Sequence, residues 1–276
     1  MSSPSRWITV GELAQAFTPD SHTAQPSQDL AGRTLDLGFE NGQLVRYRFA
    51  TGDKLFWVVI DGADRQREVR EAYLAIKMRP GFYFVDFVRH LDRGTTVSLL
   101  LDIDLGIVTA LIATLPGKEE TQGSLTDRAA MGKELTLVSA SFLSGIVDQT
   151  FTADTPRHLA TSDLVGKRVE YAYSPTERYE HIYLNENFYT WQCLSGAEKG
   201  LADTDRCHYY KLADDLYFFV WREKIVPTLG AAVIDFDLMR SAGKIFGYQG
   251  GDFAKTTNFT IGAHARLLNV TERDTG

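Results

Sequence analysis

The chain has 276 residues, of which 44% are hydrophobic and 24% charged, the proportions of an ordinary globular protein. Its formal net charge of −7 argues against nucleic acid or an anionic membrane as the main partner, because both require a basic face. Its two cysteines, Cys193 and Cys207, form neither a disulfide framework nor a zinc site, and there is no apolar run long enough for a signal peptide or a membrane span. We therefore expect a cytoplasmic protein.

The first regular element expected is a short helix near the N-terminus. The segment Thr9-Val-Gly-Glu12 has the form of a capping box and opens the sequence VGELAQAF, in which Leu13 and Phe17 lie four residues apart on one apolar face. Because this helix is too short to form a domain of its own, we expect it to cover or plug the first β unit, which follows it.

Short strand-like segments separated by Gly, Pro or Asp occupy residues 30–115, and a further one at 135–143, after the polar and turn-rich stretch 116–131, is expected to close the unit. The clearest signal is Glu40-Asn41-Gly42 between two alternating runs, which predicts a tight hairpin. Six or more short strands with tight connections favour an antiparallel meander or barrel over a βαβ fold. The helix and this first barrel are expected to occupy residues 1–151, and the polar segment 152–163 is expected to be a linker.

Residues 164–276 repeat the plan of the first unit. Leu30-Ala-Gly-Arg33 is matched by Leu164-Val-Gly-Lys167, the sequence YFVDF at 83–87 by YFFVW at 217–221, and DIDL at 102–105 by DFDL at 235–238. Three matched blocks in the same order indicate a tandem duplication. The predicted fold class is therefore all-β, with two antiparallel barrels in tandem, and aromatic residues make up 12% of the chain, as suits a β-rich fold that can enclose an organic ligand.

The segments WITVGELAQAF, DLAGRTLDLGFENG and DLVGKRVEYAYSP together resemble the MoaF family. The resemblance extends over about residues 7–270. It implies two calycin-like (lipocalin-like) barrels, but no agreed activity, because the family is named after an operon rather than a reaction.

The second unit is also similar, more distantly, to phenolic acid decarboxylases, which are cofactor-free enzymes built on small calycin barrels. The residues that match that pattern are Tyr171 and Tyr173, Tyr179-Glu180, the Ser195-Gly196 turn and, at the position of the catalytic carboxylate, Glu223. The essential arginine of that family is missing, because Leu201 stands in its place and Arg206 comes several residues late. Arg206 is the candidate to supply that positive charge in a decarboxylase-like site.

Two strands of the second unit carry the predicted catalytic residues. Tyr171 and Tyr173 are two apart on a strand and point to one face, so inside a barrel they would form a pair of donors for an oxyanion. Alternation places Glu223 on one face with Tyr217, Phe219 and Trp221, where desolvation would raise its pKa and suit it to acid–base catalysis. The alternatives are core or outward-facing tyrosines bonded to backbone, and a solvated strand-end glutamate.

Further candidates for substrate binding are the polar and aromatic residues near these strands. They are His181, Tyr179, Tyr189, Trp191, Arg206, His208, Tyr217 and Trp221. No spacing predicts a metal site, and no cofactor is expected. In the first unit, Leu37 and Phe39 replace the tyrosine pair and Arg89 replaces Glu223, so we interpret that unit as structural or as an interface, with a weaker claim to a second site for Arg89 and His90.

The sequence thus supports three hypotheses for the second barrel. The first is a cofactor-independent lyase or isomerase acting on a small aromatic or enolisable compound, such as a carboxylate or a phenol, with the tyrosine pair holding an oxyanion while Glu223 moves a proton. The alternative is a non-catalytic carrier or sensor for a small organic ligand, since fold does not decide between these roles. The third is a structural interaction module, and association into a homo-oligomer through barrel edges is left open.

Overall fold

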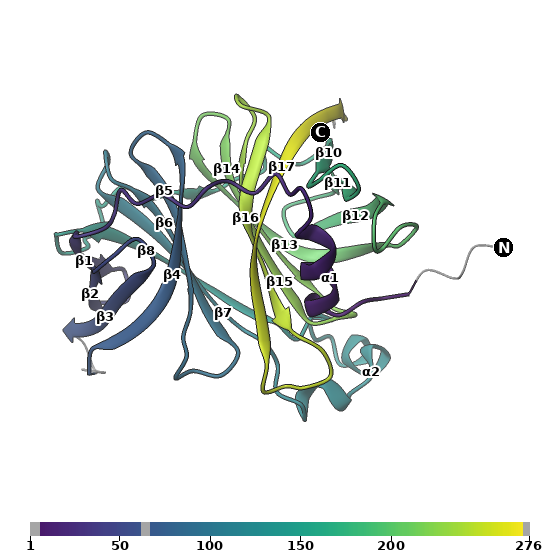
Figure 1. Ribbon diagram of the computed structural model, residues 1–276, viewed down its shortest axis with the longest axis horizontal. Helices are drawn as coiled ribbons and strands as arrows, with labels where there is room; N and C mark the ends of the chain where they lie inside the picture. The colour runs from purple at the N-terminus through teal and green to yellow at the C-terminus, as the bar shows by residue number, and fades with distance from the viewer. Residues whose placement is uncertain (1–5, 62–66, 273–276) are drawn as a thin grey trace. The chain divides into compact units, whose positions relative to one another are not determined.

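The computed structural model describes residues 6–61 and 67–272, in which nearly all regular structure is antiparallel β-strand (Figure 1). The chain forms two compact units, each built on a closed barrel of eight strands. The predicted all-β fold with two tandem barrels and a short N-terminal helix is confirmed. No helix of the described part of the chain is long and apolar enough to cross a membrane.

The first barrel consists of eight strands in which each pairs with the next in the chain. They are β1 (Thr34–Phe39), β2 (Leu44–Phe49), β3 (Lys54–Asp61), β4 (Val69–Arg79), β5 (Phe82–Val88), β6 (Thr95–Asp102), β7 (Ile107–Thr114) and β8 (Ser139–Val147). β8 returns to β1 through the pairs Leu37↔Val147 and Phe39↔Gly145, which closes the barrel. The predicted hairpin at Asn41-Gly42 joins β1 to β2, with Gly42 in the left-handed region that this tight turn requires.

The second barrel repeats this order. Its strands are β10 (Lys167–Ala172), β11 (Arg178–Tyr183), β12 (Phe188–Ser195), β13 (Ala202–Ala213), β14 (Leu216–Glu223), β15 (Thr228–Asp235), β16 (Arg240–Tyr248) and β17 (Thr256–Val270), and the short β9 (Leu159–Ala160) adds to β13. β17 pairs with β10, which closes the ring. Matching strands occupy matching registers: Thr95 faces Thr114 in the first barrel, and Thr228 faces Gly247 in the second.

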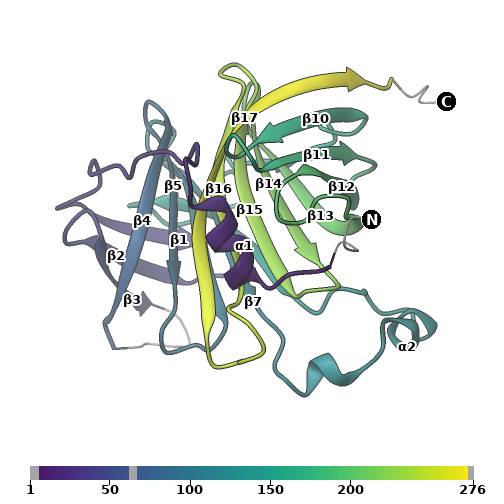
Figure 2. The ribbon, with the colours of Figure 1, turned by 45° about the vertical axis from the view of Figure 1, so that its right-hand side comes forward.

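The N-terminal helix α1 (Val10–Phe17) forms with the predicted capping box, in which the Glu12 backbone N–H donates to the Thr9 hydroxyl and the Thr9 backbone N–H donates to the Glu12 carboxylate. The prediction that it covers the first barrel is wrong. Its buried side chains join the core of the second barrel, where the helix packs on β16 and β17 (Figure 2).

A local difference between the two barrels explains where the helix lies. Val10 packs directly onto Gly247 of β16, where any Cβ would overlap the Val10 side chain. Thr114 holds the same register position in the first barrel, so that strand carries a side chain where β16 has none. The helix therefore packs on the second barrel, where Gly247 leaves room for Val10, and not on the barrel that follows it in the chain.

The long connection between β7 and β8 also belongs with the second barrel, although chain order assigned it to the first. It carries the 3-10 turn η1 (Glu120–Gln122) and the helix α2 (Leu125–Ala130). The Tyr248 hydroxyl donates to the Pro116 carbonyl at 2.7 Å, and the buried Arg222 binds Glu134 at 2.9 Å and the Val138 carbonyl at 3.0 Å. The predicted first unit, residues 1–151, therefore includes two segments that belong elsewhere. The N-terminal segment with α1, up to Ala24, and the segment Leu115–Ser139 both group with the second barrel.

Candidate functional site

A small cavity lies inside the second barrel, among aromatic side chains from several strands. Its lining residues come from α1, several of the strands and one turn: Leu13, Phe17, Tyr173, Tyr179, His181, Tyr189, Trp191, Glu198, Trp221, Glu223 and Ile245. We call this space the barrel cavity. It offers about 30 Å³ to the centre of a water-sized sphere. A single water needs about 10–15 Å³ on that measure, so the barrel cavity has room for about two.

Glu223 lies at the end of β14, where alternation predicted it. The indole N–H of Trp221 donates to its Oε1 at 3.0 Å, and the Trp221 ring lies over Gly230 of β15, where a Cβ would overlap it. Burial, together with the negative charges of Asp205 and Glu198, raises the pKa of the Glu223 carboxyl well above its usual range. Glu223 is only partly buried as a whole residue, but the shift favours the protonated form of its carboxyl group.

Glu198 is a second carboxyl group in the cavity wall, and it is absent from the residues predicted for the site. It lies in the turn between β12 and β13 and is 8% exposed, and the Tyr179 hydroxyl donates to its Oε2 at 3.1 Å. Burial raises the pKa of Glu198 to about 7, and nearby Glu177 adds to the effect. No periodic pattern runs through the polar turn that carries it, so only the folded turn reveals that the side chain is buried.

Tyr173 and Tyr189 supply hydroxyl groups to the barrel cavity. Burial raises the pKa of both, and ionisation of Glu223 would raise it further, so each hydroxyl stays neutral and can donate. Neither hydroxyl has a hydrogen-bond partner within residues 6–61 and 67–272. These two donors are therefore available to an oxygen atom of a bound molecule.

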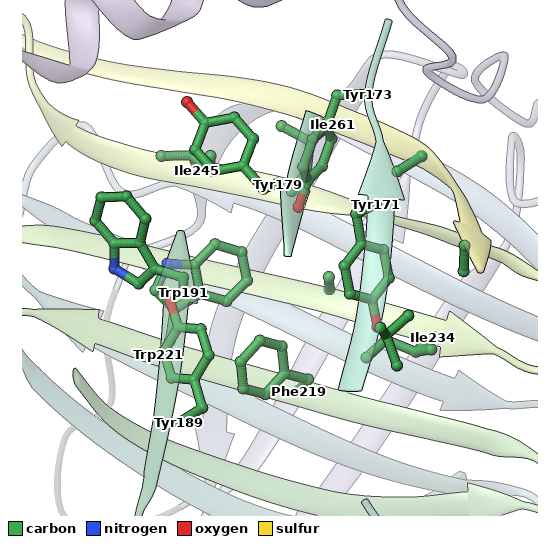
Figure 3. Packing of buried hydrophobic residues seen from close by; sticks show 14 of the residues in the cluster. Tyr171, Tyr173, Tyr179, Tyr189, Trp191, Phe219, Trp221, Ile234, Ile245 and Ile261 are labelled. Carbon is green, nitrogen blue, oxygen red and sulfur yellow. The ribbon is translucent and has the colours of Figure 1, made fainter. Parts of the chain in front are cut away.

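Tyr171 has a different environment from Tyr173, although both point to the interior. Its hydroxyl shares a 2.7 Å hydrogen bond with the Tyr183 hydroxyl, and both rings are about 1% exposed. Figure 3 shows Tyr171 beside Ile234 and apart from Trp191 and Trp221. Of the predicted tyrosine pair, the structure brings only Tyr173 to the barrel cavity.

His181 lies in the cavity wall, enclosed by aromatic rings. It is 5% exposed, and its ring centre is 4.8 Å from that of Tyr171 and 5.2 Å from that of Tyr189. Burial lowers the pKa of His181 to about 3, so the imidazole is neutral at physiological pH. Its buried Nδ1 has no hydrogen-bond partner among the residues that the structure describes.

Trp191 is held beside the cavity by a second buried acid. Its indole N–H donates to Asp205 Oδ2 at 3.0 Å, and the Lys224 backbone N–H donates to the other oxygen at 3.2 Å. Burial raises the pKa of Asp205, against the opposing effect of the Lys224 charge. Asp205 alternates with the buried Cys207 and Tyr209 on β13, so an alternation argument could have found it.

Three predicted binding residues do not reach the barrel cavity. Arg206 and His208 occupy the outward positions of β13, and Arg206 binds Glu134 at 2.9 Å instead. Tyr217 is on the inner face but donates to Asp163 at 3.2 Å. The other predicted binding residues, Tyr179, His181, Tyr189, Trp191 and Trp221, all line the cavity together with Tyr173 and Glu223.

Comparisons with known proteins agree with this architecture. A model of the MoaF N-terminal domain matches residues 5–117, and a model of the MoaF C-terminal domain matches residues 158–271. Protein MoaF from Klebsiella aerogenes is 40% identical over 274 residues, which cover 98% of each chain. A crystal structure of a putative β-lactamase from Burkholderia vietnamiensis shares 15% identity at a TM-score of 0.33, covering 41% of this chain and 100% of that one, a likeness too weak to carry an argument. The chain therefore belongs to the MoaF family.

Proposed function

We propose that the second barrel is a cofactor-independent acid–base site, of the lyase or isomerase type, for a small aromatic or enolisable compound. One observation carries the proposal: Glu223 and Glu198, two carboxyl groups with raised pKa values, line the same cavity as two neutral tyrosine hydroxyls. Perturbed carboxyl groups in a cleft are typical of acid–base sites.

The two acids suit opposite halves of a proton transfer. Glu198, with a pKa of about 7, can remove a proton from the carbon next to a carbonyl group at neutral pH. The electrons then move to the carbonyl oxygen, and the hydroxyls of Tyr173 and Tyr189 donate to the oxyanion that forms. Protonated Glu223 returns a proton to carbon at a second position, which completes an isomerisation, and proton exchange between the acids resets the site.

Helix α1 forms part of the wall of the barrel cavity. Phe17 lies with its ring centre 4.9 Å from that of Tyr173 and 5.8 Å from that of Tyr179, and Leu13 lines the same space. Since the cavity has room for about two waters, an organic substrate must displace these side chains. The proposed substrate therefore enters as α1 shifts, and the returning helix excludes water during proton transfer.

Deuterium exchange tests the proposal even while the product of the reaction is unidentified. The protein is incubated in D₂O with a panel of hydroxycinnamates and small β-dicarbonyl compounds, and deuterium bound to carbon is measured by mass spectrometry. The wild type is expected to accelerate incorporation into one class, and Glu198→Gln, which removes the base, to lower that rate by about 10²–10⁴-fold. Glu186→Gln, at an exposed glutamate of the same barrel, is the matched control and should keep the wild-type rate.

The same panel distinguishes catalysis from carriage. Thermal shift reports binding to the folded state whether or not chemistry follows. If a compound stabilises the wild type, and neither it nor any other compound of the panel acquires deuterium, the result would support the carrier function instead. Wild-type exchange rates in Glu198→Gln would contradict the role given to that carboxyl group.

A further inference from the structure

The first barrel contains a pocket that the proposed reaction does not use. It offers about 250 Å³ to the centre of a water-sized sphere. Its lining residues all belong to the first barrel: Asn41, Gln43, Val45, Trp57, Val59, Arg89, Ile112 and Leu143. On the same measure it is several times larger than the barrel cavity, so a small organic molecule fits without rearrangement.

Two side chains of this pocket hold buried N–H groups that lack an acceptor. The indole Nε1 of Trp57 and the guanidinium Nε of Arg89 are both buried, and neither has a hydrogen-bond partner in the described ranges 6–61 and 67–272. Leaving a buried donor unpaired is unfavourable, and folded proteins rarely do so. Two such donors on one pocket indicate that an acceptor from outside the chain completes the site.

The sign of the pocket's charge identifies that acceptor as an anion. Arg89 is the charged residue among the lining side chains, and its guanidinium lies 4.6 Å from the centre of the Trp57 ring. Its Nη1 binds Asp92 at 3.3 Å, but the Asp92 side chain is half exposed and does not line the pocket. Nε remains directed to no partner, and a carboxylate oxygen is the strongest acceptor for such a donor.

The duplicated architecture places this arginine at the position of the proposed catalytic acid. The Arg89 backbone N–H donates to the Thr95 carbonyl, in the register in which Glu223 pairs with Thr228. Thr95 and Thr228 are themselves equivalent, since each begins the next strand of its barrel. The same place thus holds a cation in one barrel and an acid in the other, so the two interiors suit ligands of different charge.

Four aliphatic residues of the pocket wall indicate the chemical nature of the rest of the ligand. Val45, Val59, Ile112 and Leu143 present branched aliphatic side chains to the pocket. An inorganic anion such as phosphate would lose hydration against these four side chains, which offer it no hydrogen bond, whereas the apolar body of an organic anion gains from the contact. We propose that the first barrel is a binding site for a small organic carboxylate, with its carboxylate on Arg89 and Trp57 and its apolar body among the aliphatic side chains.

This proposal favours the second site at Arg89 over the interpretation of the first unit as structural or as an interface. Leu37 and Phe39, which replace the tyrosine pair, are indeed buried in the core. The hydrogen-bond donors of the first barrel lie instead on Arg89 and Trp57. The neighbouring His90 takes no part, because its Nδ1 lies 2.9 Å from Glu71 and it does not line the pocket.

The indole resonance of Trp57 provides a direct test. The full chain is labelled with ¹⁵N, the Trp57 Nε1–H signal is assigned from its loss in Trp57→Phe, and benzoate, isobutyrate, their neutral amides and inorganic phosphate are titrated in. Both carboxylates are expected to shift this signal and to bind at least about tenfold more tightly than their amides, since bonds to a charged donor are the stronger ones. Phosphate should leave the signal in place.

Variants then assign the contacts. Arg89→Gln is expected to weaken benzoate binding, measured calorimetrically, by about ten- to a hundredfold. Arg93→Gln, at an exposed arginine of the same turn, is the matched control and should bind as the wild type does. If Arg89→Gln does not fold, Trp57→Phe keeps the ring and removes only the N–H, and it should also weaken binding. The proposal is overturned if neither carboxylate moves the Trp57 signal, if phosphate binds as well as benzoate, or if the variants bind benzoate like the wild type.

Discussion

Replacing Glu198 with glutamine is expected to change how stability depends on pH. The carboxyl pKa is about 7 in the folded protein, against an ordinary value of 4.5 for an unfolded chain. Between these values the folded state binds the extra proton, so this group makes the wild type less stable as pH rises through that window. A difference of about 2.5 units, at about 1.4 kcal/mol each, corresponds to about 3.5 kcal/mol in full, of which about 3 kcal/mol falls between pH 4.5 and 8. Glutamine keeps an oxygen for the Tyr179 hydroxyl and removes the titration.

The assay is urea denaturation of both proteins from pH 4.5 to 8, followed by tryptophan fluorescence. In a Trp57→Phe background the remaining tryptophans, Trp7, Trp191 and Trp221, all belong to the unit of the second barrel. The advantage of Glu198→Gln over its parent should grow by about 3 kcal/mol across the range and level off above pH 7. Glu186→Gln, the exposed control, should run parallel to the parent. Parallel curves for Glu198→Gln as well would refute the raised pKa.

Three further changes test the packing around the site, each by denaturation. Phe17→Ala removes a buried ring and should lower the unfolding free energy by about 3–5 kcal/mol, whereas a loss below about 1 kcal/mol would mean that α1 is not docked as described. Tyr171→Phe leaves the Tyr183 hydroxyl buried without its partner and should lower the unfolding free energy by about 1–3 kcal/mol, while deuterium incorporation stays at the wild-type rate. A loss of exchange without a loss of stability would contradict this structural role. Glu134→Gln weakens the anchor of the buried Arg222 and should lower it by about 1–3 kcal/mol, and an unchanged midpoint would argue against that anchor.

Much of the architecture could be predicted because its signals are local. Turns and alternating strands can be recognised from short stretches of sequence, and the duplicated blocks indicated that the same strand order occurs twice. Alternation on β14 also placed Tyr217, Phe219, Trp221 and Glu223 on the inner face. It could not indicate depth along the barrel. Tyr217 is six residues from Glu223, about 20 Å along a strand, so sharing a face did not bring it to the same cavity.

The parts that sequence reasoning missed depend on contacts distant in the chain. Docking of α1 on the second barrel rests on the space above Gly247, which no pattern within the helix encodes. Glu198 becomes a buried acid only when its turn folds over the barrel interior. The two unpaired donors of Trp57 and Arg89 could not be anticipated either, because an N–H without an acceptor is a property of the folded surroundings.

The protonation state of Glu223 at neutral pH decides the proposed chemistry most directly. Infrared difference spectra of the wild type against Glu223→Gln at pH 7, with Glu186→Gln as the control, isolate the carbonyl stretch of this one carboxyl group. A protonated carboxylic acid band that disappears in Glu223→Gln and persists in Glu186→Gln is the predicted result, since burial raises the Glu223 pKa well above its usual range. Carboxylate bands alone at this position would show an ionised Glu223 and contradict its role as the general acid.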